Sequence, residues 1–343
     1  MSAQQIPATP PNPLQIFTTI QGYQRAFALK AAVDLDLFTA IGKGSGTAGE
    51  IGKACNASER GVRILCDSLV IMELLTKKGN RYALTEDSAF FLDSRSQAYM
   101  GRALKFLMHP TQLARFEQLG NAVRKGGSSD DGSLAPNDPI WMDFANGMAP
   151  MMMPAAQAMA GMLFEELNSR PSVKVLDIAA SHGLFGITVA QRLPKAHIYA
   201  LDWANVLEVA RENAAKQGLA NRYHLMPGSA FDVDYGTGYD AILITNLLHH
   251  FTPADNEKML KKAHAALNPG GQVVILEFVP NEDRITPPGA AIFSLTMLGN
   301  TPEGDAYTMA EYTTMCRNAG LETPRQIALD PTPESLVVAR KPF

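Results

Sequence analysis

The fold of this chain is decided by the stretch VKVLDIAASHG, which runs from Val173 to Gly183. The apolar run at its start predicts a buried strand over Val173–Ala179. The small residues that follow predict a tight turn, and Gly183 marks the start of a helix that reaches about Arg192. A strand, a tight turn and a helix in this order form the first half of a parallel βαβ unit.

The same alternation of strands and helices continues toward the end of the chain. Strands that alternate with helices of about ten or more residues form a parallel sheet. The last two predicted strands, TPRQIAL and SLVVARK, leave no room for a crossover helix, so they should form an antiparallel hairpin at one edge. We therefore predict an α/β fold. The elements between are predicted strands at His197–Asp202, YHLMPG, Tyr239–Thr245 and GQVVILEFV, and predicted helices at Ala204–Gln217, Asp255–Leu267 and TMAEYTTMCRNAG.

The N-terminal part of the chain has a helical pattern instead. Apolar residues at helical spacing predict one amphipathic helix over Ala28–Ile41, and Thr47 with Glu50 has the spacing of a capping box. A further helix opens near Ser58 and is followed by LLTKKGNRYALT, which has the pattern of a β-hairpin. Helices followed by a hairpin indicate a winged helix. Because the charges near its second helix are mixed in sign, we favour a structural or dimerising role over DNA binding.

Length and composition exclude several classes of protein. The chain has 343 residues, 46% of them hydrophobic and 19% charged, which are globular values. The formal net charge of −4 argues against a nucleic-acid binder. No apolar run is long enough to cross a membrane, and the first residues have neither the basic nor the apolar region of a secretory signal. Because the 3 cysteines lack metal-binding spacing, we expect a cytoplasmic protein with reduced thiols.

Composition also suggests how the chain is divided. At about 100–200 residues per domain, two domains are the default. The stretch Lys125–Pro139 is rich in Gly, Ser, Asp and Pro and indicates a loop. Methionines between Met142 and Met153 predict either core packing or an adaptable substrate lid. We predict a winged-helix domain over residues 13–100, a helical linker and lid over residues 101–165, and a ligand-binding domain over residues 166–343.

Strand ends carry the candidate site residues, because ligands of an open parallel sheet bind past the carboxyl ends of its strands. The first is the turn from Asp177 to Gly183, where small side chains such as Ala179 let a ligand approach the backbone. The second is Asp202, whose carboxylate can accept both ribose hydroxyls of an adenosine, with Trp203 as an apolar face for the adenine. The alternatives are an ordinary tight turn and, for Asp202, a helix N-cap.

Two further strand ends complete the candidate site. Thr245 begins TNLLHHF, in which His249 is a candidate general base because imidazole titrates near neutral pH. Glu277 lies in the otherwise apolar VVILEFV, where a carboxylate is costly unless it is paired. We expect Glu277 to accept a hydrogen bond from His249 and so fix its tautomer. A polar loop histidine and a solvated acid are the alternatives. The third strand end, GSAFD, is expected to border the base through Gly228, Ser229, Ala230 and Phe231.

The adenosine-binding pattern lacks a phosphate loop, since neither GxxxxGK[ST] nor GxGxxG occurs. An adenosine site without such a loop indicates S-adenosylmethionine as the cofactor. A nicotinamide oxidoreductase is a weaker alternative because the glycine loop is poor. The adjacent His249 and His250 have no metal-ligand spacing, so we expect no metal.

From residue 13 onward the chain resembles the caffeic-acid/acetylserotonin class of S-adenosylmethionine-dependent O-methyltransferases. The resemblance lies in an ordered set of segments that includes AVDLDLF, LTEDSAFFL, DIAASHG, LDW, GSAFD, NLLHHF, NPGGQVVILEF and TMAEY. It implies a class I methyltransferase domain with a Rossmann-like, mostly parallel seven-stranded sheet and a C-terminal antiparallel hairpin. It also implies that the winged-helix N-terminal domain is a dimerisation domain and that the protein is a homodimer.

The resemblance implies roles for individual residues. The family's D-x-G-G-G-x-G loop falls on Asp177–Gly183 and its ribose acid on Asp202. Its L-H-D-W stretch makes His249 the base, and its histidine-orienting acid falls on Glu277. The lid-helix motif F-N-x-x-M implies cofactor contacts by two further residues, Phe144 and Met148.

The loop keeps only the last glycine of the family pattern, and the lid-helix asparagine sits one place late, at Asn146. Three further positions depart from the pattern. Ser229 stands where the family has the acid that meets the adenine amine, and His250 replaces the aspartate after the base. Ala306 stands where the family has a second glutamate. Either Asp305 substitutes for this glutamate, or one acid suffices, or the chemistry differs.

We expect methyl transfer to a hydroxyl of a small, aromatic or polyketide-like acceptor, with His249 taking the hydroxyl proton. C- or N-methylation, or a methyltransferase-like protein without transfer activity, is the alternative among related functions. A winged-helix regulator that senses a ligand and binds DNA is the alternative of another class. We expect no membrane or nucleic-acid partner. The predicted acceptor pocket is apolar and adaptable and consists of Met152, Phe293, Met297 and Asn300 beside Met148.

Overall fold

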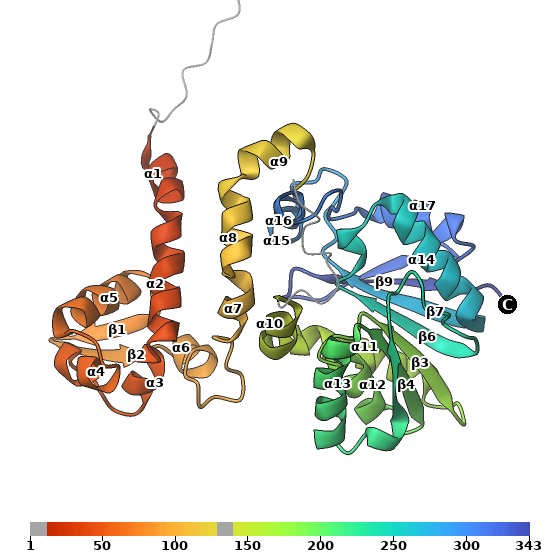
Figure 1. The fold of residues 1–343 in the computed structure, drawn as a ribbon, viewed down its shortest axis with the longest axis horizontal. Coiled ribbons are helices and arrows are strands. Elements are labelled where there is room, and N and C mark those ends of the chain that lie inside the picture. Colours follow the sequence, from red (N-terminus) through yellow and green to blue (C-terminus); the bar gives the residue numbers. More distant parts are fainter. Residues whose placement is uncertain (1–11, 129–139) are drawn as a thin grey trace, which may run out of the picture. The chain divides into compact units, whose positions relative to one another are not determined.

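The structure is a computed structural model that describes residues 12–128 and 140–343. The chain divides into two compact units, of which the first ends at Leu104 and the second begins at Lys105 (Figure 1). The division into residues 13–100, 101–165 and 166–343 stays a prediction. Across the described ranges, none of the helices combines the length and the apolar character that a membrane crossing requires.

The first unit contains helices followed by the predicted hairpin. The predicted helix Ala28–Ile41 is broken in two, because Asp36 adopts a left-handed backbone conformation with a φ of 52°. The capping box is present, since Thr47 and Glu50 each accept the backbone N–H of the other. The elements are α1 (Leu14–Ile20), α2 (Gly22–Asp34), α3 (Leu37–Gly42), α4 (Ala48–Ala54), α5 (Glu59–Ile71), β1 (Leu75–Lys78), β2 (Arg81–Leu84) and α6 (Glu86–Phe91).

This unit has its own apolar core, and its first two helices expose large apolar side chains. Val62, Cys66 and Leu69 form the buried face of α5 and belong to the same core as Phe38 and Ile51. α1 buries none of its residues. Large exposed apolar groups mark interaction surfaces. Those on α1 and α2 are Leu14, Ile16, Phe17, Ile20, Tyr23 and Phe27.

The second unit contains a sheet with helices packed around it. α11 packs against α12, and α14 packs against α17. Its helices are α8 (Pro110–Glu117), α9 (Leu119–Lys125), α10 (Ile140–Gly147), α11 (Ala149–Leu167), α12 (Leu184–Arg192), α13 (Ala204–Lys216), η2 (Ala220–Arg222), η3 (Leu248–His250), α14 (Pro253–Ala266), α15 (Pro288–Ala291), α16 (Phe293–Asn300) and α17 (Met309–Asn318), and α7 (Ala103–Leu107) precedes them. Its strands are β3 (Val173–Ile178), β4 (Ala196–Asp202), β5 (Tyr223–Pro227), β6 (Tyr239–Thr245), β7 (Leu267–Glu277), β8 (Arg325–Ala328) and β9 (Ser335–Arg340).

The sheet has seven strands in the order β5-β4-β3-β6-β7-β9-β8. The pairs from β5 to β7 are parallel, and β9 pairs antiparallel with both β7 and β8. The predicted mostly parallel sheet with a C-terminal antiparallel hairpin is therefore confirmed. β3 is flanked by β4 on one side and β6 on the other, and such a reversal of strand order opens a crevice at the carboxyl ends of the strands.

The start of β7 differs from the prediction. The sequence predicts the strand over GQVVILEFV, which begins at Gly271, yet β7 begins at Leu267 and includes residues 268–270. The pairing of β7 with β6 is irregular here, with a register shift between Tyr239 and Ala241. A bulge takes up the residues that break the regular ladder, so the strand starts earlier than its apolar run.

Candidate active site

The predicted contact between His249 and Glu277 is present at the carboxyl ends of β6 and β7. Glu277 Oε2 lies 2.5 Å from Nδ1 of His249. Glu277 Oε1 accepts the backbone N–H of Leu247 at 3.0 Å and that of His249 at 3.3 Å. Glu277 is 0% exposed and His249 is 4% exposed. Both oxygens of the carboxylate that is costly to bury are thus hydrogen-bonded, and low local polarity strengthens these bonds.

Aromatic rings surround His249. The ring of Phe293 meets that of His249 edge-on at 4.9 Å and stacks on Phe278 at 3.8 Å. The ring of His250 lies 4.3 Å from that of His249, and Trp141 of α10 meets His250 at 5.7 Å. Burial lowers the pKa of His250 well below its usual value, and the neighbouring His249 lowers it further. His250 is therefore neutral at pH 7. Trp141 was not predicted as a site residue, because no local sequence pattern separates it from a core residue.

The predicted cofactor loop connects β3 to α12. Asp177 lies buried at its base, where Oδ2 accepts the N–H of Gly186 at 3.0 Å, and burial raises the pKa of Asp177 to about 7. Ala179 and Ser181 have positive φ values of 58° and 51°, and Gly183 follows with 77°. The loop therefore keeps a backbone path that favours glycine, although only Gly183 is one.

Asp202 connects this loop to the end of β4. Its Oδ2 accepts the N–H of Ser181 at 2.8 Å, and Oδ1 accepts that of Trp203 at 2.7 Å. The N-cap residue of α13 is Trp203, so the alternative prediction of an N-cap at Asp202 is wrong. Burial raises the pKa of Asp202 to about 6, although the two N–H donors oppose this rise. A carboxylate has about four lone-pair sites, so Asp202 can still accept further donors.

The third strand end lies beside the second. The N–H of Gly228 donates to the carbonyl oxygen of Asp202 at 2.9 Å. Ser229 Oγ accepts the N–H of Phe231 at 3.1 Å and thereby orders the turn after β5. Two further predicted contacts lie near the ends of β5 and β6, namely Ala230 and Thr245.

Helix α10 packs against the cofactor loop. Phe144 stacks on His182, with 6.0 Å between ring centroids and an interplanar angle of 11°. His182 is 2% exposed, and burial lowers its pKa to about 4. Met148, predicted together with Phe144, is buried at the N-cap of α11. His182 lies within the predicted loop but was not predicted as a separate site residue, although its place just before Gly183 was a usable signal.

The predicted acceptor pocket is brought together in part. Phe293 contacts His249, and Met297 and Asn300 lie further along the same helix, where both are buried. The buried Oδ1 of Asn300 makes no hydrogen bond among the described residues. Met152 is buried in α11. The part of these residues in acceptor binding stays a prediction.

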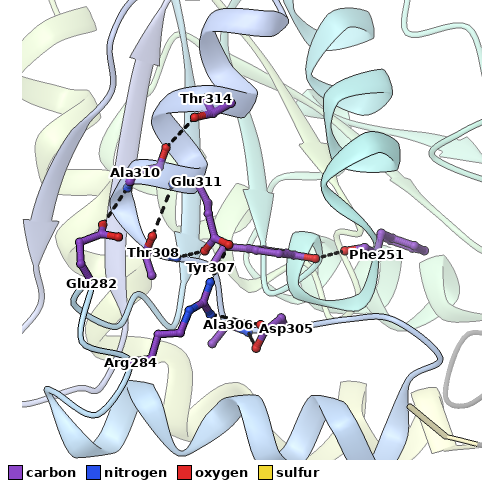
Figure 2. Close-up of polar contacts among 10 residues, drawn as sticks. All are labelled: Phe251, Glu282, Arg284, Asp305, Ala306, Tyr307, Thr308, Ala310, Glu311 and Thr314. Carbon is purple, nitrogen blue, oxygen red and sulfur yellow. Dashed lines mark hydrogen bonds and ion pairs between the residues drawn. The ribbon is translucent and has the colours of Figure 1, made fainter. Parts of the chain in front are cut away.

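The loop before α17 carries the position of the missing second acid. Ala306 is 1% exposed there. The side chain of Asp305 faces Arg284, whose guanidinium it meets at 3.2 Å (Figure 2). The hydroxyl of Tyr307 donates to the carbonyl oxygen of Phe251 at 2.5 Å and ties this loop to the turn after His249. Because the Asp305 side chain is 38% exposed and engaged in an ion pair, it does not supply a buried acid.

Comparisons with known proteins cover both units. Residues 143–322 match the O-methyltransferase domain, and residues 17–94 match the O-methyltransferase dimerisation domain. The solved structure of a putative O-methyltransferase from Nostoc punctiforme is 50% identical, with a TM-score of 0.92, and covers 97% of this chain and 100% of that chain.

Curated relatives are more distant. The 3-hydroxy-5-methyl-1-naphthoate 3-O-methyltransferase of Streptomyces sahachiroi is 26% identical over 95% of this chain and 95% of that protein. The L-tyrosine C(3)-methyltransferase of Streptomyces lavendulae is 26% identical over 91% of this chain and 88% of that protein. Within the described ranges, no group of three or more His, Cys, Asp or Glu side chains could hold a metal ion.

Proposed function

This chain belongs to the O-methyltransferase family, as its resemblance predicted, and from that premise we propose that it methylates a hydroxyl group of a small aromatic or polyketide-like molecule with His249 as general base. The methyl donor is S-adenosylmethionine. The observation that carries the proposal is the buried contact between His249 and Glu277. A histidine oriented by a buried acid is the arrangement of a general base.

The residues at the strand ends fit S-adenosylmethionine. Asp202 has free lone pairs for ribose hydroxyls, and the neighbouring Trp203 offers an apolar side chain. The small side chains of the loop before α12 let the donor approach the backbone. When bound, the donor supplies a methyl group on a positively charged sulfur, which leaves readily.

The proton transfer follows from the tautomer of His249. Because Nδ1 donates to Glu277, Nε2 is left with the lone pair that accepts a proton from the acceptor hydroxyl. The resulting imidazolium is stabilised by the Glu277 carboxylate. Phe293 against the His249 ring provides an apolar wall that suits a planar acceptor. The remaining contribution is positioning, which can supply about 7–11 kcal/mol of the barrier.

C-methylation is the second candidate, since one relative carries the name of a C(3)-methyltransferase of L-tyrosine. Removal of a phenol proton also activates the ring carbon beside the oxygen. The same His249 could therefore serve either reaction, and the pose of the acceptor would decide which atom receives the methyl group.

The proposal is tested with methyl-labelled S-adenosylmethionine and hydroxynaphthoates or other phenols as acceptors. We expect a methyl ether, identified by mass spectrometry and by the chemical shift of its methyl group. A product methylated on carbon would favour the second candidate, and no transfer to any hydroxyl would overturn the proposal.

We also infer that the protein is a homodimer. The N-terminal unit matches a dimerisation domain, and α1 and α2 expose an apolar surface. Burying such a surface in a second copy removes it from water, which stabilises the association by about 25 cal/mol per Å² before the costs of binding.

A further inference from the structure

We propose that Glu334 is a positioning residue of this active site, and that its buried carboxyl acts on His249 together with Glu277 and supplies the second acid that the loop at Ala306 lacks. The inference rests on the proposed role of His249. Glu334 lies far from these residues in sequence, and no motif points to it.

The sheet topology brings Glu334 to the site. β9 runs antiparallel to β7, so the first residue of β9 lies beside the last residue of β7, at the carboxyl end of β7. In the register of this pair Ser335 lies opposite Glu277, and Glu334 directly precedes Ser335. On the other side of β7, the N–H of Asn246 donates to the carbonyl oxygen of Leu276 at 2.9 Å. Asn246, Glu277 and Glu334 therefore lie at the same end of three adjacent strands.

The surroundings of Glu334 are those of a functional acid. Glu334 is 7% exposed, and its carboxyl interacts with the side-chain amide of Asn246. Both polar side-chain atoms of Asn246 are themselves buried. Glutamate is almost never buried unless it is paired, so a buried acid and amide beside a candidate base indicate a role other than packing.

The pKa of Glu334 depends on the other polar and ionisable groups at these strand ends. Burial raises the pKa of Glu334 to about 7. The nearby Asn246 amide opposes this rise, Glu277 of β7 adds to it, and His249 of η3 opposes it. Glu334 is thus close enough to both members of the pair to respond to their charge.

The chemical consequence concerns the charge on His249. When His249 takes the acceptor proton, its imidazole becomes positive, and an ionised Glu334 favours that state. No bond to Glu334 is made or broken, and the proton stays on His249. By linkage, protonation of His249 also favours ionisation of Glu334, so the two groups change charge together.

The first test compares rates. We would measure kcat/KM of wild type, Glu334→Gln, Glu334→Asp and Asp305→Asn from about pH 5.5 to about pH 8.5. The ratio of the wild-type kcat/KM to that of Glu334→Gln should rise by about tenfold as pH passes through 7. Only the ionised Glu334 assists, and an interaction that shifts a pKa by one unit changes the rate by about a factor of ten. Glu334→Asp should keep most of the wild-type dependence of kcat/KM on pH. Asp305→Asn, the control, should have the wild-type dependence. A ratio that stays constant with pH would reduce Glu334 to a structural role and overturn the proposal.

The second test does not depend on the acceptor. In protein labelled with ¹³C at the glutamate carboxyls, infrared spectra should show one protonated acid that titrates near pH 7, and Glu334→Asp should remove that band. In His249→Gln its midpoint should move upward, because His249 lowers the pKa of Glu334. An unchanged midpoint would overturn the proposal even if hydroxyl methylation is confirmed. The predicted shift without any methyl ether product would instead overturn the proposed function alone.

Discussion

Glu277 holds His249 at two points, with Oε2 at 2.5 Å from the ring Nδ1 and Oε1 at 3.3 Å from the backbone nitrogen. One carboxylate therefore fixes both the position of the turn and the orientation of the imidazole. Oε1 also binds the N–H of Leu247, so the acid is anchored without the ring. Loss of the imidazole should leave this turn intact, so the His249 side chain can be replaced without disturbing the fold.

His249→Ala should keep cofactor binding and lose turnover. General base catalysis contributes about 10²–10⁴-fold, and we expect kcat to fall by that factor because no other group takes the proton. Calorimetry with S-adenosylhomocysteine measures the binding, and product formation measures turnover. Full activity of the variant would remove His249 from the role of base.

Glu277→Gln should cost less than His249→Ala in kcat. The amide can still accept from Nδ1 of His249, although it no longer stabilises the imidazolium by charge. Steady-state rates of the two variants decide the order. A larger loss in Glu277→Gln would indicate that Glu277 is itself the base.

Binding of S-adenosylhomocysteine should weaken in acid through Asp202. Its pKa is raised to about 6, and only the ionised carboxylate accepts both ribose hydroxyls. Binding favours the ionised form, so affinity should be flat above pH 6 and fall by up to about tenfold per pH unit below it. Asp202→Asn should bind more weakly and lose this pH dependence, as calorimetry can measure.

A matched surface acid serves as the control for Asp202. Glu208 lies on α13 in an exposed ion pair with Arg211, and Glu208→Gln should keep the wild-type profile. If Asp202→Asn also kept the wild-type pH dependence of affinity, a different group would be titrating, and Asp202 would not bind the ribose.

The centre of the sheet could be predicted from sequence because its strands β3, β6 and β7 are largely buried and form apolar runs. Every residue of β6 is buried, and its bounds, Tyr239–Thr245, are those predicted. Glu277 was found because a charge in such a run needs a partner. Glu334 could not be found in this way, since it lies among turn residues and its neighbourhood depends on the register of β9 with β7. The break at Asp36 was also missed, because a single left-handed residue leaves the helical spacing of apolar residues almost unchanged.

The apolar surface of α1 and α2 should hold two copies together. Phe17 is 56% exposed and Phe27 is 48% exposed. Replacing both with Asp places charges in the buried interface, so light scattering should find a monomer where the wild type gives a dimer. Ile285→Asp is the control, because Ile285 is 71% exposed outside this surface and its variant should remain dimeric. A monomeric wild type at micromolar concentration would contradict the inferred homodimer.

Glycine substitutions at two neighbouring residues of the cofactor loop should change the free energy of unfolding in opposite directions. Ala179 has a φ of 58°, which costs a residue with Cβ about 1–2 kcal/mol, whereas Ala180 has no positive φ and is 2% exposed. Glycine also makes the unfolded chain more flexible, which costs about 0.4–1 kcal/mol at either position.

Ala179→Gly should therefore raise the free energy of unfolding by about 0.5–1 kcal/mol, and Ala180→Gly should lower it by about that amount or more, since it also loses a buried methyl group. Urea denaturation without ligand measures both. Equal destabilisation by the two variants would mean that the loop does not hold the left-handed conformation at Ala179. If the signs are opposite, the alanine in this loop is retained at a cost in stability, which is expected of a segment shaped by ligand binding and not by folding.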